Sequence, residues 1–234
     1  MPEKAERKAL AQGLKNLNEN MTTLAELSEL SIRKAIDSLS RADVAEAQEV
    51  FTLDGEIYGL QEEIESSAVG LIALHAPVAR DLRMITTSLK ITTDLDRIGR
   101  YAKDIAEISM QFGGQPPPGW KDLPKIPQMA EFTIGMVDKT IDAFVKRDAD
   151  SVRDIMVVDD TVDRLHDEVF NELVESMKSG RIPVEAGARY VLVDRHLERI
   201  ADHAVNIGLR VVYMVTGEMM PRMRAADRAK VGRG

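Results

Sequence analysis

Apolar residues recur at helical spacing through most of the chain. Between Leu17 and Leu39 they stand three or four positions apart, which is the pattern of a helix with one buried face. No segment shows the turn residues and alternating pattern of a β-hairpin. The chain is therefore predicted to be all-α. The apolar pattern places six long helices over about 5–39, 43–74, 77–112, 127–145, 148–177 and 184–216.

Glycine and proline mark the breaks between these helices. His75-Ala76-Pro77 ends one helix, because proline disfavours helical geometry in the residue before it. The clearest boundary is 113–119, where three consecutive prolines lie between glycines. Such a segment cannot continue a helix and is expected to form a semi-rigid spacer.

The sequence contains two copies of one pattern. Residues 35–55 align without a gap onto 140–160, and residues 94–108 align onto 196–210. The period of about 100 residues suits a small domain. We therefore predict two tandem, pseudo-symmetric three-helix bundles. The predicted parts are a first bundle over 1–112, a Gly/Pro linker over 113–124, a second bundle over 125–217 and a basic, disordered tail over 218–234.

Composition narrows the class of protein. Hydrophobic residues make up 44% of the chain and charged residues 30%, as in a globular protein. The net charge of −8 argues against direct nucleic-acid binding, which needs a basic face. Cysteine is absent, which excludes disulfides and thiolate metal sites. No apolar run suggests a secretory signal or a membrane span, so a cytoplasmic protein that reaches membranes only through partners is expected.

Acidic residues spaced by four form two ladders in the second copy. Each step of four turns about 40° around a helix, so such residues share one slightly slanted stripe. If the two helices are antiparallel neighbours, their carboxylates can converge on a cation such as Mg²⁺, Mn²⁺, Fe²⁺ or Zn²⁺. His166 could add a nitrogen ligand. The candidate metal ligands are Asp159, Asp163, Asp167, Asp194, Glu198 and Asp202.

The first copy has a weaker version of the same pattern. Arg100 stands where the second copy has Asp202, and a fixed positive charge repels a cation. We expect Arg100 to pair with Asp96 or Asp104 and to close this half of the protein to metal. A solvated acidic surface without metal is the alternative for both copies. His196 and His203 are expected to be packing or interface residues. The corresponding first-copy carboxylates are Asp54, Glu62, Asp96 and Asp104.

Two segments carry a family resemblance. DLDRIGRYAKDIAEI at 94–108 and HLERIADHAVNIGLRVVYMVTGE at 196–218 resemble the paired signature of the PhoU family of phosphate-uptake regulators. Glu198 and Asp202 match the family's E-x-x-x-D motif in the second repeat. In the first repeat Asp96 matches its leading position, but Arg100 replaces the closing Asp.

The resemblance implies a non-enzymatic role. Family members are cytoplasmic, often homodimeric, metal-binding negative regulators of phosphate uptake. They are thought to connect a phosphate ABC transporter, through an ATPase like PstB, with a sensor kinase like PhoR. Two alternatives remain, a carboxylate-bridged metalloenzyme and a metal-free helical scaffold. Direct phosphate sensing is not indicated, because the sequence shows neither a Gly-rich phosphate loop nor a basic anion nest.

Overall fold

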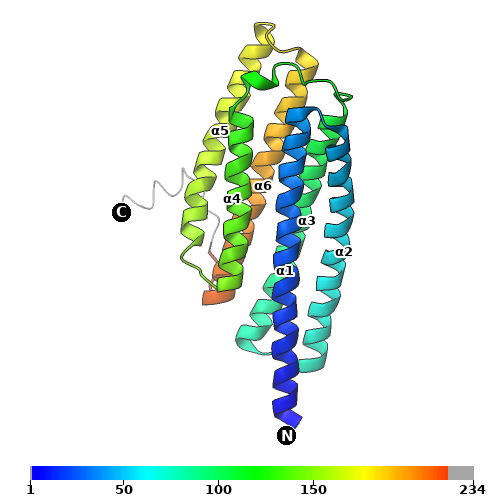
Figure 1. Cartoon of the computed structure of the whole chain (residues 1–234). Helices are drawn as coiled ribbons and strands as arrows, with labels where there is room; N and C mark the ends of the chain where they lie inside the picture. Colours follow the sequence, from blue (N-terminus) through cyan, green and yellow to red (C-terminus); the bar gives the residue numbers. More distant parts are fainter. Residues whose placement is uncertain (1, 221–234) are drawn as a thin grey trace, which may run out of the picture.

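The computed structural model describes residues 2–220 and contains six long helices (Figure 1). Within these residues there is no strand, so the all-α prediction is confirmed. Residues 221–234, most of the predicted basic tail, lie outside the described residues. The helices are α1 (Pro2–Arg41), α2 (Val44–His75), α3 (Ala79–Met110), α4 (Lys125–Lys146), α5 (Val152–Lys178) and α6 (Val184–Thr216), and a single 3₁₀ turn, η1, spans Trp120–Asp122.

The helix ends follow from local chemistry. The carboxylate of Asp43 accepts a hydrogen bond from the backbone N–H of Glu46 at 3.0 Å and so caps the start of α2. Four helices, α1, α2, α4 and α6, are followed by a residue with positive φ, namely Ala42, Ala76, Arg147 and Gly217. Glycine adopts this conformation without strain, whereas Ala76 and Arg147 carry a Cβ that opposes it.

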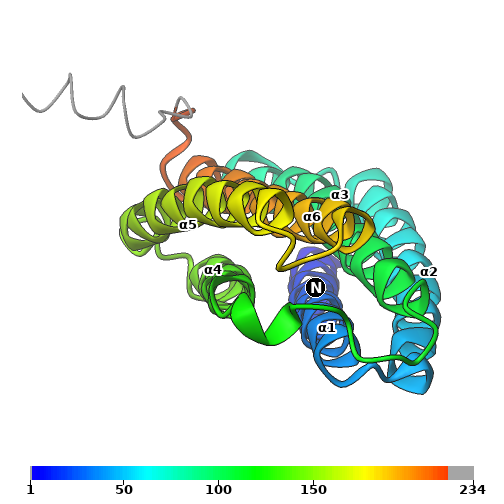
Figure 2. The same ribbon diagram turned by 90° about the horizontal axis from the view of Figure 1, so that it is seen from above.

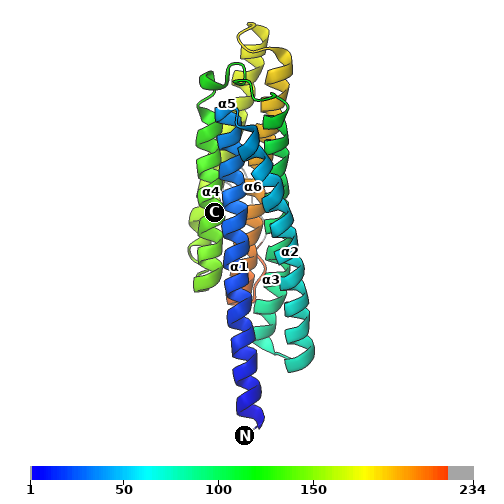
Figure 3. The same cartoon turned by 45° about the vertical axis from the view of Figure 1, so that its right-hand side comes forward.

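The two bundles lie side by side and share one core. Helices α1, α2 and α3 pack against one another, as do α4, α5 and α6, and the bundles meet where α3 packs on α6 and α1 on α4. Seen from above, α3 and α6 lie between α2 and α5 (Figure 2). Figure 3 shows the N-terminal end of α1 projecting beyond the other helices. Buried side chains from both bundles form one continuous hydrophobic cluster, so neither bundle has a separate core.

Polar groups cross the seam between α3 and α6. Nδ1 of His203 lies 2.8 Å from Oδ1 of Asp94, and Nδ1 of His196 lies 3.8 Å from Oδ2 of Asp104. The ring of Tyr101 is 5.7 Å from both imidazole rings. Burial lowers the pKa of His196 and raises the pKa of Asp104. The prediction that both histidines are interface residues is confirmed.

The segment after α3 connects the two bundles and packs against α6. Trp120 and Leu123 are buried. The indole of Trp120 lies 5.6 Å from the ring of Tyr190 in α6, whose hydroxyl donates to the carbonyl oxygen of Pro118 at 2.8 Å. Isolated apolar residues among prolines give no periodic signal, although a lone tryptophan there is a sign of burial.

Candidate functional site

The interface between α5 and α6, called the α5–α6 groove below, holds the most deeply buried carboxylate of the second bundle, Asp194. Asp194 is fully buried, and its Oδ2 lies 2.8 Å from Nδ1 of His166 on α5. One helical turn further along α6, Oε1 of Glu198 forms an ion pair with Nη1 of Arg195 at 2.8 Å. The spacing of four places Asp202 next, on the same side of α6 and partly exposed. Two acids and a histidine from neighbouring helices thus lie together.

These groups are poorly compensated by hydrogen bonds. Both oxygens of Asp194, Oε2 of Glu198 and Nδ1 of His166 are buried without a well-formed hydrogen bond. The close contact between His166 and Asp194 is an ion pair at 2.8 Å. Burial raises the pKa of Asp194 to about 7, although His166 acts in the opposite direction. Burial also raises the pKa of Glu198, and the charge of Asp202 adds to that effect. The groove is therefore a place where a proton or another cation is stabilised.

The ladder predicted on α5 does not face this groove along its whole length. Asp159 is buried, but Asp163 and Asp167 are exposed. A step of four residues turns about 40° around the helix, so the stripe turns away from α6 over two steps. The charge of Asp163 still helps to raise the pKa of Glu198, so Asp163 lies near the acids of α6, and the convergence of all six carboxylates stays a prediction.

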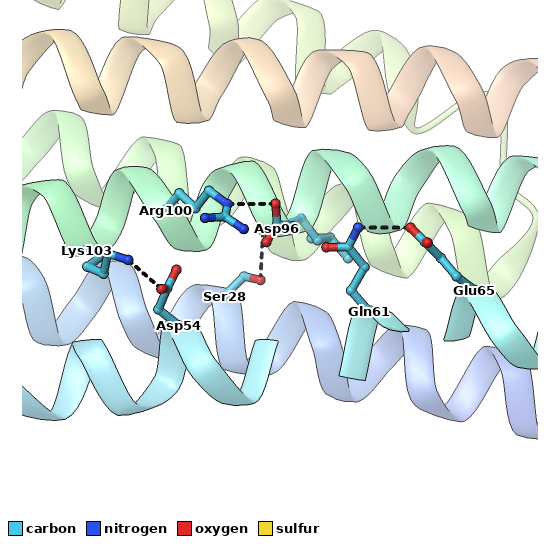
Figure 4. Close-up of polar contacts among 8 residues, drawn as sticks. Ser28, Asp54, Gln61, Glu65, Asp96, Arg100 and Lys103 are labelled. Atoms are coloured by element: carbon cyan, nitrogen blue, oxygen red, sulfur yellow. Dashed lines mark hydrogen bonds and ion pairs between the residues drawn. The ribbon is translucent and has the colours of Figure 1, made fainter. Parts of the chain in front are cut away.

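The corresponding groove in the first bundle, between α2 and α3, is neutralised by internal cations (Figure 4). Nε of Arg100 donates to Oδ2 of the buried Asp96 at 2.9 Å, as the sequence predicted. Nζ of Lys103 lies 2.6 Å from Oδ2 of Asp54. The other two candidates lie elsewhere. Glu62 is exposed and accepts the Tyr58 hydroxyl, and Asp104 belongs to the α3–α6 seam.

The repeat relates the two grooves position by position. With the 105-residue offset, His166 corresponds to Gln61, whose Oε1 is also buried without a hydrogen bond. Glu198 corresponds to Asp96, whose Oδ1 is likewise unpaired. The sequence analysis missed Gln61, although the offset that aligns the two copies identifies it. Each groove therefore keeps a pair of underused buried polar groups. In the first groove both Asp96 and Asp54 have a cation partner, whereas in the second Arg195 pairs with Glu198 and the fully buried Asp194 has only His166.

The second groove has the right donor types for a metal ion but not a finished coordination shell. Carboxylate oxygens and an imidazole nitrogen without hydrogen bonds are suitable ligands for Mn²⁺, Fe²⁺ or Zn²⁺. Within residues 2–220, however, no three His, Asp or Glu side chains are arranged around one possible ion position. Side chains such as Glu198 would have to reorient before the groove could coordinate a metal.

The chain is similar to known proteins in both sequence and structure. The family model described as the PhoU domain matches twice, over residues 21–109 and 126–211. A phosphate-specific transport system accessory protein PhoU homolog from Clostridium acetobutylicum is 32% identical over 216 residues, which cover 92% of this chain and 97% of that protein. The homolog from Synechocystis is 33% identical over 213 residues, covering 91% and 94%.

Solved structures agree with the sequence match. The crystal structure of PhoU from Pseudomonas aeruginosa has a TM-score of 0.82 and 30% identity, covering 89% of this chain and 99% of that one. The phosphate transport system regulatory protein PhoU from Streptococcus pneumoniae also has a TM-score of 0.82, at 27% identity, covering 91% and 100%. The two matched segments lie in the two three-helix bundles, and the relatives match along almost their whole lengths. The chain therefore belongs to the PhoU family.

Proposed function

We propose that the chain is an accessory regulator of phosphate uptake that restrains a phosphate ABC transporter when phosphate is plentiful. The observation that carries the proposal is the match to the PhoU domain over both bundles, with relatives named as accessory proteins of phosphate-specific transport. A binding role suits the fold, because long helices present extended polar surfaces rather than an enclosed reaction chamber. The regulator acts as an adaptor between the transporter ATPase and a sensor kinase.

The surface supports an adaptor with two contact regions. Leu74 and Val78, each 76% exposed, lie at the α2–α3 turn, and Val184, 66% exposed, lies at the α5–α6 turn. These two turns are at opposite ends of the molecule (Figure 1). Exposed apolar side chains at both ends offer separate contact points for two proteins. None of the helices within residues 2–220 has the length and apolar character to cross a bilayer. As part of the same proposal, the protein is cytoplasmic, acts as a homodimer and meets the membrane through the transporter.

The regulatory role is tested by removing the chain from its host. Cells without it should keep taking up phosphate in phosphate-rich medium, because the transporter is no longer restrained. Re-expression of the wild-type chain should return ³²P-phosphate uptake to its low, replete level. Unchanged uptake in the deleted cells would contradict the proposed function.

We further propose that the α5–α6 groove binds a divalent cation. Asp194 and Glu198 would supply carboxylate oxygens, His166 would supply a nitrogen, and Asp202 would lie at the rim. The proposal is supported by the buried oxygen and nitrogen atoms of these three residues that make no hydrogen bond. The α2–α3 groove is proposed to bind no metal, since Arg100 and Lys103 already neutralise Asp96 and Asp54.

Metal content of the purified protein tests the second proposal. After incubation with Mn²⁺, Fe²⁺ or Zn²⁺, plasma mass spectrometry should find about one ion per wild-type chain and little in the Glu198→Ala, Asp202→Ala double variant. The matched control is Glu19→Ala with Glu131→Ala, which removes two exposed carboxylates elsewhere and should retain the metal. Equal metal content in all three proteins would place the metal outside this groove, and no metal in any of them would leave a metal-free adaptor.

A further inference from the structure

Three arginines meet at one end of the molecule, where both bundles contribute. Arg80 and Arg83 belong to the first two turns of α3, and Arg147 follows the last turn of α4. Nε of Arg83 donates to the carbonyl oxygen of Met214, near the end of α6, at 3.4 Å. A pocket of about 100 Å³ opens beside them. Its lining residues are Arg80, Met84, Arg147, Met214 and Val215.

The charge of this cluster is not balanced by carboxylates. Elsewhere in the structure, arginines such as Arg33 and Arg100 are within 4 Å of an acidic partner. For Arg80, Arg83 and Arg147 no such ion pair exists among residues 2–220. The polar side-chain contact of Arg147 is with the sulfur of Met84 at 3.2 Å, and a thioether is a weak acceptor for a guanidinium with five N–H donors. The chain has 39 acidic and 31 basic residues, so carboxylates are not scarce.

The backbone conformation of Arg147 decides which substitution tests its side chain. Arg147 has φ 56° and ψ 45°, the left-handed conformation that glycine usually occupies at the end of a helix. Ala42, Ala76 and Ala79 also have positive φ, so the conformation by itself assigns no role to the side chain. Glycine at this position would remove the guanidinium without adding backbone strain.

Helix capping accounts for only part of the cluster. A cation near the C-terminal end of a helix is stabilised by the helix dipole, and Arg83 is hydrogen-bonded to such a carbonyl. Arg80 lies at the opposite kind of helix end, in the first turn of α3, where the positive end of the dipole is offset by Asp81 and gives a guanidinium no stabilisation. Capping therefore leaves Arg80 and most donors of Arg147 unexplained.

We propose that this pocket binds a small oxyanion of the orthophosphate class between α3 and α4. The planar guanidinium group donates paired hydrogen bonds to phosphate oxygens, and two such groups line the pocket. Its volume corresponds to about three water molecules in the liquid, which suits a single small anion and is too small for a nucleotide. Binding of the anion does not depend on the proposed function, but its biological meaning rests on it. An uptake regulator that binds phosphate could sense the ion that is transported.

The test is a calorimetric titration of the full-length chain with inorganic phosphate at constant ionic strength. The key variant is Arg147→Gly, which removes the guanidinium but relieves the left-handed backbone, so its melting temperature should be unchanged or higher. Phosphate binding should weaken about tenfold in Arg147→Gly and further in Arg80→Ala, Arg147→Gly. The matched control, Arg33→Ala with Arg41→Ala, removes two exposed arginines that pair with acids and should bind like wild type.

Two results would overturn the proposal. One is that the wild-type chain does not bind phosphate, or binds it as weakly as chloride at the same ionic strength. The other is equal loss of binding in the arginine-pocket variants and in the control, which would mean general charge attraction. Because binding is measured on the purified chain, failure here is distinct from failure of the uptake experiment, which concerns transport in cells.

Discussion

Replacing Asp194 by Asn should make the protein more stable at pH 8, by roughly 2 kcal/mol or more, since the variant no longer buries a charge. The pKa of Asp194 is raised to about 7 from 3.8, so the folded wild-type protein holds a proton that the unfolded chain releases near pH 4. Wild-type stability should therefore fall as the pH rises from about 4 through 7. The largest possible contribution of this residue is roughly 4 kcal/mol.

Urea unfolding at a series of pH values between 5 and 8 measures this effect. The difference between wild type and Asp194→Asn should be smallest at pH 5, grow up to about pH 7 and level off above it. The difference isolates Asp194, because Glu29, whose pKa burial also raises to about 7, is present in both proteins. Exposed Asp167→Asn is the control and should change stability by less than about 0.5 kcal/mol. An Asn variant that is less stable at pH 8 would contradict the burial argument.

Replacing Trp120 by Ala should lower the free energy of unfolding by about 3–5 kcal/mol, the usual effect of truncating a buried aromatic residue. The indole is 8% exposed and packs on Tyr190, so its loss leaves a cavity between the inter-bundle segment and α6. Trp120 is the single tryptophan of the chain, so circular dichroism at 222 nm is the suitable measurement. Phe170→Ala removes a half-exposed ring and should change stability by less than about 1 kcal/mol. Equal effects of the two substitutions would mean that the segment is a spacer after all.

The positions of the helices and of the breaks between them could be predicted from the sequence. Apolar periodicity depends on residues three or four apart, and the break at His75-Ala76-Pro77 depends on neighbours, so both can be seen locally. The internal repeat showed which residues of the two copies are equivalent. It thereby led to the prediction of the ion pair between Arg100 and Asp96, which is confirmed. These features need no knowledge of how the bundles pack.

Contacts between remote segments could not be predicted in the same way. His203 and Asp94 are 109 positions apart, and their 2.8 Å contact depends on the side-by-side packing of α3 and α6. The arginine pocket is a further example, since Arg80 and Arg147 come from different bundles. On α5 the spacing of four was correctly recognised, but a small rotation per step was enough to expose Asp167.

The ion pairs of the first groove have a consequence for how the protein responds to a ligand. Arg100 and Lys103 belong to the chain itself, so their effective concentration beside Asp96 and Asp54 is far above that of dissolved ions. The carboxylates of the first groove therefore already have their cations. If the α5–α6 groove binds a divalent ion, as proposed above, the chain has one such site. Its binding curve should be hyperbolic, with a Hill coefficient of about 1, so any steeper dose response in the cell must arise from the association of several chains.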